Sequence, residues 1–256
     1  MGRHEMHADS LESKGWGRFA RTIDMLGLDG FERLRSSFVV VMGLGGVGSH
    51  AAVALARSGI GRIRLVDFDT VTESSLNRHA VACPGDVGRD KVELVAARMR
   101  AINPDLEVEE CRAFFHEETA DALLAGPPDY VVDAIDSLTP KVVLLKSCGE
   151  RGIPVIGCMG ASARRDPSLV RVGLLGETQG CPLARMLRKR LRKQGVALDI
   201  PVVYSTEPAG AVLPPDDAEE RYERGRVRNR LPSLPTLPAM FGNAAAQVVI
   251  EALASG

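Results

Sequence analysis

The feature that most constrains the fold is a glycine-rich turn between an aliphatic run and a helix-forming segment. Residues 38–42 read Phe-Val-Val-Val-Met, and residues 43–48 read Gly-Leu-Gly-Gly-Val-Gly. A continuous aliphatic run is typical of a strand that is buried on both faces of a parallel sheet. The spacing G-x-G-x-x-G, followed by a helix over 49–58, predicts a turn whose backbone approaches a phosphate. The sequence therefore predicts a nucleotide-binding βαβ unit, without yet choosing the nucleotide.

Aliphatic runs and helical segments continue to alternate after this unit. Aromatic residues make up only 4% of the chain, so the core depends on aliphatic side chains. The order of elements indicates an α/β fold with a doubly wound, mostly parallel, Rossmann-like sheet and right-handed crossovers. We expect further strands at 62–68, 106–111, 130–135 and 153–158, and helices at 17–34, 89–102 and 138–151.

The pattern changes after residue 160. Strands are expected at 169–174 and 200–204, with a basic helix over 182–194 between them. Residues 207–238 are rich in proline and charge and are predicted to form a mobile loop. We expect a flexible tail over 1–15 and one domain over 16–256, with a nucleotide-binding half at 36–160 and a C-terminal half of mixed strands and helices at 161–256.

Composition excludes several classes of protein. The formal net charge is −1, and the five cysteines show no CxxC spacing, so neither a disulfide framework nor a structural zinc site is expected. The polar N-terminus does not resemble a secretory signal. The apolar stretch 239–254 has the length of one buried helix and is too short to span a bilayer. We therefore expect a cytoplasmic protein with no integral membrane segment.

Charged residues after the glycine turn separate the candidate functions. Asp67 ends the second predicted strand, where an NAD-binding domain would hold a ribose hydroxyl. The next motifs are Ser75-Leu76-Asn77-Arg78, Gly88-Arg89-Asp90-Lys91 and Asp133-Ala134-Ile135-Asp136. A nucleotidyl transferase needs cations to neutralise the phosphates and a carboxylate to hold Mg²⁺, and a dehydrogenase does not. This order of residues favours nucleotidyl transfer over an NAD-dependent oxidoreductase.

These motifs make residues 39–136 resemble the ubiquitin-activating enzyme superfamily, which includes bacterial adenylyltransferases of sulfur-carrier proteins. The resemblance implies that Arg78 and Lys91 contact phosphates and that Asp136 holds Mg²⁺ near the reacting phosphate. It also implies that a partner subunit donates Arg21 to the ATP site, so that the active unit is a homodimer. The positions to which it gives a role in binding ATP are Gly43, Gly45, Gly46, Gly48, Asp67, Asp69, Ser75 and Asn77.

One of these positions departs from the superfamily pattern. Relatives often have Asn-Leu-Asn-Arg where this chain has Ser75-Leu76-Asn77-Arg78. A hydroxyl can still donate to a phosphate oxygen, but its reach is shorter than that of an amide. The departure concerns the role of Ser75 and leaves the class of enzyme unchanged.

The C-terminal half resembles one branch of the superfamily. The two zinc-binding CxxC pairs and the crossover cysteine of many carrier-activating relatives are absent from the sequence. The motifs that match are Gly160-Ala161, Asp166-Pro167, Pro182-Leu183-Ala184-Arg185, Tyr204-Ser205-Thr206-Glu207 and Pro238-Ala239-Met240-Phe241-Gly242. They are similar to those of the tRNA threonylcarbamoyladenosine dehydratases. This resemblance implies an adenylation domain that uses ATP to activate the carboxylate of threonylcarbamoyladenosine in tRNA and promotes its cyclisation.

Several alternatives stay open at this point. The chain could adenylate the C-terminal glycine of a sulfur-carrier protein, or serve as a non-catalytic ATP-binding partner in a sulfur relay. Basic clusters at 185–193 and 221–230 suit an RNA backbone, although a solvated helix face has the same composition. Cys181 replaces an aspartate of the relatives and is expected to be inert, as is Cys158, a small buried side chain. His79 is expected either near the nucleotide or at the surface.

Overall fold

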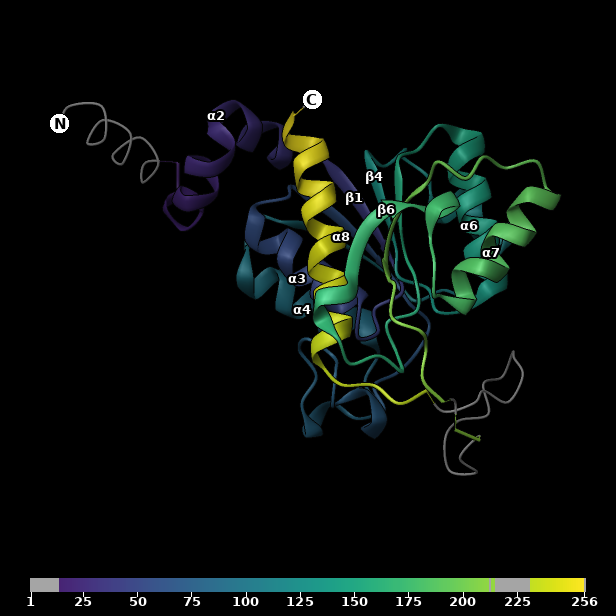
Figure 1. Cartoon of the computed structure of the whole chain (residues 1–256). Helices are drawn as coiled ribbons and strands as arrows, with labels where there is room; N and C mark the ends of the chain where they lie inside the picture. Colours follow the sequence, from purple (N-terminus) through teal and green to yellow (C-terminus); the bar gives the residue numbers. More distant parts are fainter. Residues whose placement is uncertain (1–13, 212, 215–230, 256) are drawn as a thin grey trace.

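A computed structural model describes residues 14–211, 213–214 and 231–255 of the chain (Figure 1). One seven-stranded sheet with the order β3-β2-β1-β4-β5-β7-β6 forms its centre. Every pairing is parallel except that of β6 with β7. The strands are β1 (Phe38–Met42), β2 (Arg62–Val66), β3 (Glu107–Cys111), β4 (Tyr130–Asp133), β5 (Val155–Cys158), β6 (Val170–Leu174) and β7 (Pro201–Ser205).

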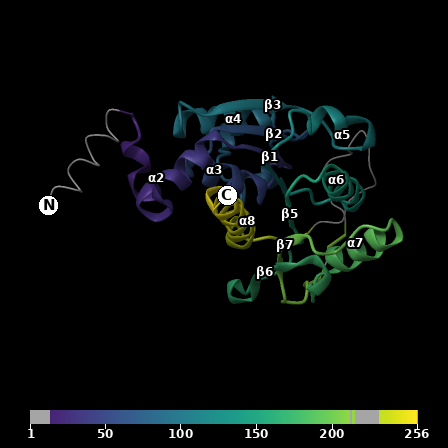
Figure 2. The same cartoon turned by 90° about the horizontal axis from the view of Figure 1, so that it is seen from above.

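Helices cover both faces of this sheet, as Figure 2 shows from above. One face packs against α3 (Gly48–Ser58), α4 (Lys91–Ile102) and α8 (Thr236–Ser255) through a core that includes Val39, Val41 and Leu65. The other face packs against α5 (Glu117–Leu123), α6 (Leu138–Arg151) and α7 (Pro182–Lys193). Burial on both faces explains the continuous aliphatic strands, and the predicted doubly wound fold is confirmed.

Helix α2 (Ala20–Ser36) lies outside these two layers. Gly27 interrupts it with a positive φ of 73°. Ile23 and Phe31 on its inner face, together with Phe19 from the turn just before it, form a separate small buried core. The helix is attached to the end of α8, where Arg33 Nε donates to the Ala254 carbonyl at 2.9 Å. The predicted tail over 1–15 lies outside the described residues apart from Lys14 and Gly15.

The C-terminal half adds strands to the same sheet. Strand β7 extends the parallel order beyond β5, and β6 closes this edge in the antiparallel direction. The predicted loop over 207–238 is too long, because α8 begins at Thr236. Only the two ends of the remaining segment are described: the Ala163 carbonyl accepts from Gly210 N at 2.8 Å, and Ala163 N donates to the Pro232 carbonyl at 2.7 Å.

Helix α8 has 20 residues, more than the sequence predicted, and by length and composition alone it could cross a membrane. Half of that stretch is buried inside this fold. Phe241, Ala245 and Val249 pack into the core beside α3. A Cβ on Gly242 would lie 2.3 Å from the Val47 carbonyl, so glycine is required for this close approach. These contacts are those of a core helix.

Candidate functional site

The predicted site residues from 43 to 136 gather at the edge where the parallel strands end. Strand β1 is followed by the glycine turn, β2 by the loop that begins at Asp67, and β4 by the loop that contains Asp136. The chain proceeds from β1 to β2 and β3 on one side and then to β4 on the other. A reversal of this kind next to β1 marks the position at which open α/β sheets bind their ligands. We call this edge of the sheet, with the residues described below, the crevice.

The glycine turn is closely packed, both within itself and against the neighbouring residues Val66 and Arg78. Gly43 has a φ of 87° and donates from its N–H to the Val66 carbonyl at 2.8 Å. A Cβ on Gly48 would lie 1.8 Å from the Gly43 carbonyl oxygen, and one on Gly46 would lie 2.9 Å from Arg78 Cγ. Around Gly45, by contrast, a Cβ would meet nothing within 4 Å. Three of these glycines are therefore required by packing, whereas Gly45 borders open space.

Asp67 connects the turn to the loop after β2. Its Oδ2 accepts from Leu44 N at 2.6 Å, and its Oδ1 accepts from Asp69 N at 2.8 Å. Burial raises the pKa of this carboxyl, and the nearby Lys91 ammonium opposes that rise. Because each carboxylate oxygen can accept more than one hydrogen bond, Asp67 keeps capacity for a further donor.

Lys91 and Asp69 form an ion pair inside the same region. Lys91 is the first residue of α4, and its Nζ lies 3.0 Å from Asp69 Oδ2. The Lys91 N–H also donates to the Asp69 carbonyl at 3.1 Å, so backbone and side chain hold the two residues together. Only 10% of the lysine side chain is exposed. The ammonium is thereby fixed at the crevice and cannot sample the solvent freely.

The Ser75–Arg78 motif lies against the glycine turn, because the Arg78 side chain packs on Gly46. Arg78 Nη1 donates to the Ser74 carbonyl at 2.5 Å and to Asn77 Oδ1 at 3.0 Å. Asn77 Nδ2 donates to the Ser233 carbonyl at 2.9 Å, which ties the motif to the end of the C-terminal loop. Ser75 is buried, and its hydroxyl lies 2.9 Å from Thr72 Oγ1. Ser75 therefore shapes the turn from within.

Asp136 lies in the loop between β4 and α6 and is exposed. This loop packs against the glycine turn: a Cβ on Gly43 would lie 2.9 Å from the Ala134 carbonyl, and Ala134 N donates to the Met42 carbonyl at 2.9 Å. Ser137 Oγ donates to Asp136 Oδ1 at 3.3 Å. The described residues contain no group of three His, Cys, Asp or Glu side chains that could hold a metal ion by themselves.

His79 is buried, so the surface alternative is wrong and the alternative near the nucleotide stays a prediction. Its Nδ1 accepts hydrogen bonds from Val81 N at 3.3 Å and Ala82 N at 3.2 Å. An imidazole nitrogen that accepts carries no proton, so the neutral ring is protonated at Nε2. Burial, assisted by the charge of Lys91, lowers the pKa of His79 to about 4. The ring is therefore neutral in the folded protein near neutral pH.

Arg21 is not brought to this edge within one chain. It is exposed on α2, which precedes the opposite, amino end of β1. Figure 1 shows α2 beside the C-terminal end of α8, away from the start of α3 where the glycine turn lies. Any contact between Arg21 and a ligand in the crevice therefore requires a second subunit.

A buried ion pair beneath the crevice was missed by the sequence analysis. Lys141 Nζ lies 2.7 Å from Asp133 Oδ2, and both side chains are fully buried. Burial raises the pKa of the Asp133 carboxyl, and the Lys141 ammonium opposes that rise. The signal was present in the sequence: Lys141 falls on the same helical stripe as the apolar Leu144, Leu145 and Cys148. A lysine on an apolar stripe indicates a buried partner.

A second missed residue is Arg164, in the loop after β5. It is 4% exposed, and it donates to the carbonyls of Gly160, Ser162 and Glu207. The preceding residue, Ala163, has a φ of 57°, in the left-handed region that alanine rarely adopts. Arg164 thus organises the loop that anchors both ends of the C-terminal segment. Its charge in a predicted loop gave no sign of burial.

The two cysteines singled out in the sequence are buried. Burial raises the pKa of Cys158 to about 12, so its thiol is not ionised near neutral pH. Cys181 precedes α7, and its Sγ lies 3.8 Å from where a Cβ of Gly160 would be. Both behave as small packing residues, as expected.

The chain is similar to known proteins of one family over most of its length. The ThiF family model matches residues 19–255. The chain is 44% identical over 235 residues to tRNA threonylcarbamoyladenosine dehydratase 2 of Saccharomyces cerevisiae, covering 86% of this chain and 52% of the relative. It is 42% identical over 190 residues to tRNA threonylcarbamoyladenosine dehydratase of Bacillus subtilis, covering 74% and 75%. The chain thus spans about half the length of the yeast relative.

A solved structure agrees with these sequence matches. The crystal structure of Escherichia coli tRNA N6-threonylcarbamoyladenosine dehydratase, TcdA, in complex with ATP superposes with a TM-score of 0.83 at 31% identity. The match covers 94% of this chain and 96% of that one. From the family model and from the similarity in sequence and fold, the chain belongs to the ThiF family and is related to its tRNA threonylcarbamoyladenosine dehydratases.

Proposed function

We propose that this protein is an ATP-dependent dehydratase that adenylates the carboxylate of threonylcarbamoyladenosine in tRNA and promotes its cyclisation. The observation that carries this proposal is the crevice itself, where a glycine turn, fixed cations and an exposed aspartate meet in a fold shared with ATP-bound TcdA. Such an arrangement suits transfer of AMP to an acid. The substrate would be found in the cytoplasm.

The glycine turn would approach the phosphates of ATP, and Asp67 would hold its ribose. Open space at Gly45 allows a phosphate to approach the backbone at the start of α3. Asp67 can accept from a ribose hydroxyl while it keeps its bonds to Leu44 and Asp69. Ser75 and Asn77 would contribute indirectly, because their polar groups hold the loop that carries Arg78.

Arg78 and Lys91 would neutralise the phosphates. Both cations already have acceptors in this chain, so their positions are set before ATP arrives. A cation placed in advance stabilises charge on the transition state without a cost of reorganisation. Asp69, which pairs with Lys91, would act by positioning that ammonium.

Asp136 would hold Mg²⁺ near the α-phosphate. Mg²⁺ commonly keeps several waters and is bound by one or two carboxylates together with substrate phosphates. A single exposed aspartate beside the glycine turn fits this kind of site, since the phosphates complete the ligand set. When bound, the ion would withdraw charge from the phosphate oxygens as AMP is transferred.

The chemistry needs no nucleophile from the protein. The substrate carboxylate attacks the α-phosphorus, pyrophosphate leaves, and the acid becomes an acyl-adenylate. An atom of the same substrate side chain then attacks the acyl carbon, and AMP departs with one former carboxylate oxygen. The net change to the tRNA is the loss of one water. Because the attack is intramolecular, correct positioning supplies much of the rate. The buried Cys158 and Cys181 have no part in it.

Mass spectrometry of nucleosides from threonylcarbamoylated tRNA tests the proposal. Incubation with ATP and Mg²⁺ is expected to lower the mass of the modified adenosine by one water and to release AMP and pyrophosphate. Asp136→Asn is expected to slow AMP formation by about 10²-fold or more, whereas Asp199→Asn, an exposed aspartate before β7, leaves it unchanged. AMP release that ignores the modified tRNA and depends on a Gly-Gly-ending carrier protein would contradict the proposal and favour the carrier-activating alternative.

A homodimer with Arg21 donated in trans is the second part of the proposal. It is supported by the position of α2 beyond the amino end of β1. Mixing two inactive variants, Arg21→Ala and Asp136→Asn, would create one intact site in each mixed dimer. Random exchange should then restore about a quarter of the wild-type activity, because half of the dimers are mixed and each has one good site of two. No recovery would show that Arg21 does not complete the site in trans. A sulfur-relay protein would be a further partner, testable by co-purification.

A further inference from the structure

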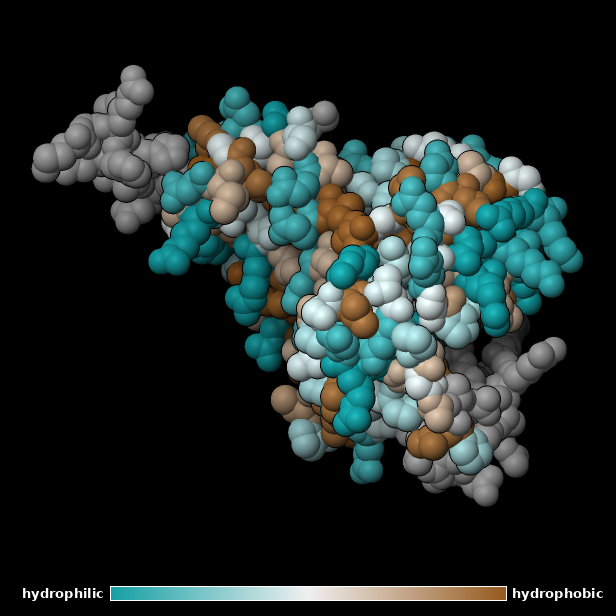
Figure 3. Space-filling model, in the orientation of Figure 1, coloured by the Kyte–Doolittle hydropathy of each residue, from teal (hydrophilic) through white to brown (hydrophobic). Residues whose placement is uncertain are grey.

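Helix α7 carries a concentration of positive charge that the crevice does not use. Its 12 residues contain no acidic side chain. Ala184, Leu187 and Leu191 form its buried stripe against the core shared with α6. The cations therefore fall on the outer side, and Figure 3 shows hydrophilic side chains gathered there, at the right of the molecule. The six cations are Arg185, Arg188, Lys189, Arg190, Arg192 and Lys193.

Two of the six cations are involved in contacts within the fold. Arg188 Nη1 donates to the Thr178 carbonyl at 2.8 Å, and Arg190 Nη1 donates to Thr139 Oγ1 at 2.8 Å. The other four are exposed, and none has a carboxylate oxygen within 4.0 Å in the described parts of the chain. We call these four side chains, Arg185, Lys189, Arg192 and Lys193, the α7 cluster.

The α7 cluster opposes helix formation. Arg185 faces Lys189 four residues later, and Lys189 faces Lys193 in the same way. Like charges at this spacing repel each other and destabilise a helix. The helix dipole favours cations in the last turn, but it does not favour Arg185 near the first. A helix face that is merely solvated would gain stability from acids at these positions, so the uninterrupted positive charge indicates an anionic ligand.

The position of α7 connects it to the crevice edge. The helix starts after Cys181, whose Sγ lies 3.8 Å from the place of a Cβ on Gly160, in the loop that follows β5. Arg185 lies one turn further on, and the cluster continues along the helix axis. Its side chains border a shallow surface hollow of about 650 Å³. A polyanion that enters the crevice at one end can therefore also contact α7.

We propose that the α7 cluster binds the phosphate backbone of the tRNA whose modified adenosine enters the crevice. This inference rests on the proposed function, because it takes tRNA as the polyanion. The cluster contributes affinity and orientation without reading bases, as phosphate contacts do. Exposed lysines and arginines act by displacing counterions from the RNA, so their contribution depends on salt.

A pair of double variants with equal loss of charge tests the proposal. Lys189→Gln/Arg192→Gln removes two cluster cations, and Arg57→Gln/Arg98→Gln removes two exposed cations from α3 and α4, on the other face of the sheet. Binding of threonylcarbamoylated tRNA is measured by fluorescence anisotropy from 50 to 300 mM KCl. The cluster variant is expected to bind about tenfold more weakly and to reduce the slope of log K against log salt by about 1.5–2.

The matched variant and a second readout separate a phosphate-binding role from a general effect of charge. The control variant should keep the wild-type affinity and salt slope. In the cluster variant, KM for tRNA should rise while KM for ATP stays the same. Equal loss in both variants would overturn the proposal, because it would indicate diffuse attraction. So would unchanged tRNA binding by the cluster variant together with loss of its binding to vesicles containing phosphatidylserine, which would assign α7 to a lipid surface.

Failure of this inference is distinguishable from failure of the proposed function. A wild-type protein that dehydrates the tRNA, together with a cluster variant that binds it normally, would refute only the role of α7. A wild-type protein that binds tRNA through α7 but never alters its mass would refute only the dehydratase activity. Circular dichroism of each variant confirms that the helix is retained, since Ala184, Leu187 and Leu191 are untouched.

Discussion

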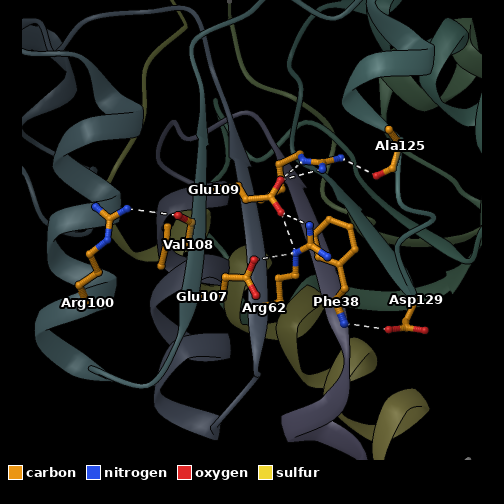
Figure 4. A network of polar contacts seen from close by, with 9 residues as sticks. Phe38, Arg62, Arg100, Glu107, Val108, Glu109, Ala125 and Asp129 are labelled. Atoms are coloured by element: carbon orange, nitrogen blue, oxygen red, sulfur yellow. Dashed lines mark hydrogen bonds and ion pairs between the residues drawn. The ribbon is translucent and has the colours of Figure 1, made fainter.

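The β2–β3 edge of the sheet and the outer face of α7 both carry closely spaced arginines, but their surroundings differ. On β2, Arg62 Nε donates to Glu109 Oε1 at 2.6 Å (Figure 4). Arg64 Nε donates to Glu109 Oε2 at 2.7 Å. Arg64 also donates to the carbonyls of Leu123 and Ala125. On α7 the four cations of the cluster have no acidic partner among the described residues.

This difference shows two uses of the same kind of side chain. At the β2–β3 edge the chain supplies the acceptors, so the guanidinium groups join adjacent strands and are not available to a ligand. The chain likewise supplies an acid to Lys91 and to Lys141, since Asp69 and Asp133 hold these two ammonium groups in place. The four cations of the α7 cluster have no such acid in the described part of the chain. Removing a paired cation should therefore cost stability, and removing a cation of the α7 cluster should not.

The largest expected effect comes from Lys141→Met, which leaves the Asp133 carboxylate buried without its cation. Breaking a buried pair in this way costs about 3–5 kcal/mol of the free energy of unfolding. Urea denaturation measures it, and Lys146→Met serves as a control, since Lys146 forms an exposed pair with Glu150 on the same helix. Equal stability losses in the two variants would remove the distinction between paired, buried charges and surface charges.

The next largest effect is a pH dependence of the free energy of unfolding that arises from His79, beside the crevice. His79 has a pKa of about 4 in the folded state against 6.5 for the ordinary side chain, so the unfolded chain takes up the proton first as pH falls. The contribution of neutral His79 to the free energy of unfolding is therefore fully present above pH 6.5. It decreases by up to about 3 kcal/mol as the pH falls to 4. In His79→Gln this part of the decrease should vanish, whereas Lys189→Gln should keep the wild-type profile because it leaves His79 and its surroundings unchanged.

A smaller decrease in the free energy of unfolding is expected from Glu109→Gln. Hydrogen bonds from Arg62 and Arg64 lower the pKa of Glu109, although burial alone would raise it. Loss of the carboxylate leaves the nearly buried Arg64 without an acidic partner and should cost about 1–3 kcal/mol. Glu110→Gln on the same strand, whose pair with Arg100 is more exposed, should cost less than about 1 kcal/mol. A larger loss of stability in Glu110→Gln than in Glu109→Gln, measured by urea denaturation, would mean that the β2–β3 pairs do not join the strands as described.

The smallest effect has the opposite sign. Lys189→Glu places an acid four residues from both Arg185 and Lys193, and so converts two repulsive pairs into attractive ones. The free energy of unfolding should rise by about 0.5–1 kcal/mol, while tRNA binding falls. Thermal unfolding at low salt measures the gain, which high salt should reduce. A loss of stability instead would mean that Lys189 has a structural role.

The sequence predicted most of the architecture because local signals agreed with one another. The aliphatic run 38–42 became β1, the glycines that follow formed the turn, and the basic segment 182–194 became α7 within one residue. The strands and helices from 62 to 158 also formed where expected, with their ends shifted by a few residues. The error at 207–238 arose because Pro238 was assigned to a loop, whereas the structure places it in the first turn of α8, where proline is tolerated.

The candidate site was only partly accessible from the sequence. Motif order placed the glycine turn, Asp67, Lys91 and Asp136 at one edge, because the ends of parallel strands meet there. It did not reveal that Ser75 is turned inward, that His79 is buried, or that Lys141 pairs with Asp133. Each of these depends on which neighbours surround a side chain, and those neighbours come from distant parts of the chain.

By itself, then, the sequence determined the order of the helices and strands, the glycine turn and the kinds of side chain at the carboxyl edge of the sheet. Periodicity and glycine spacing indicate these features because each is set by residues only a few positions apart. Only the tertiary structure decided which charges are neutralised. Arg64 and Arg192 look alike in sequence, yet one lies against Glu109 and the other faces outward with no acid beside it in the described chain. The free energy of a charge depends on its burial and its partner, and both are fixed only when the strands and helices pack together.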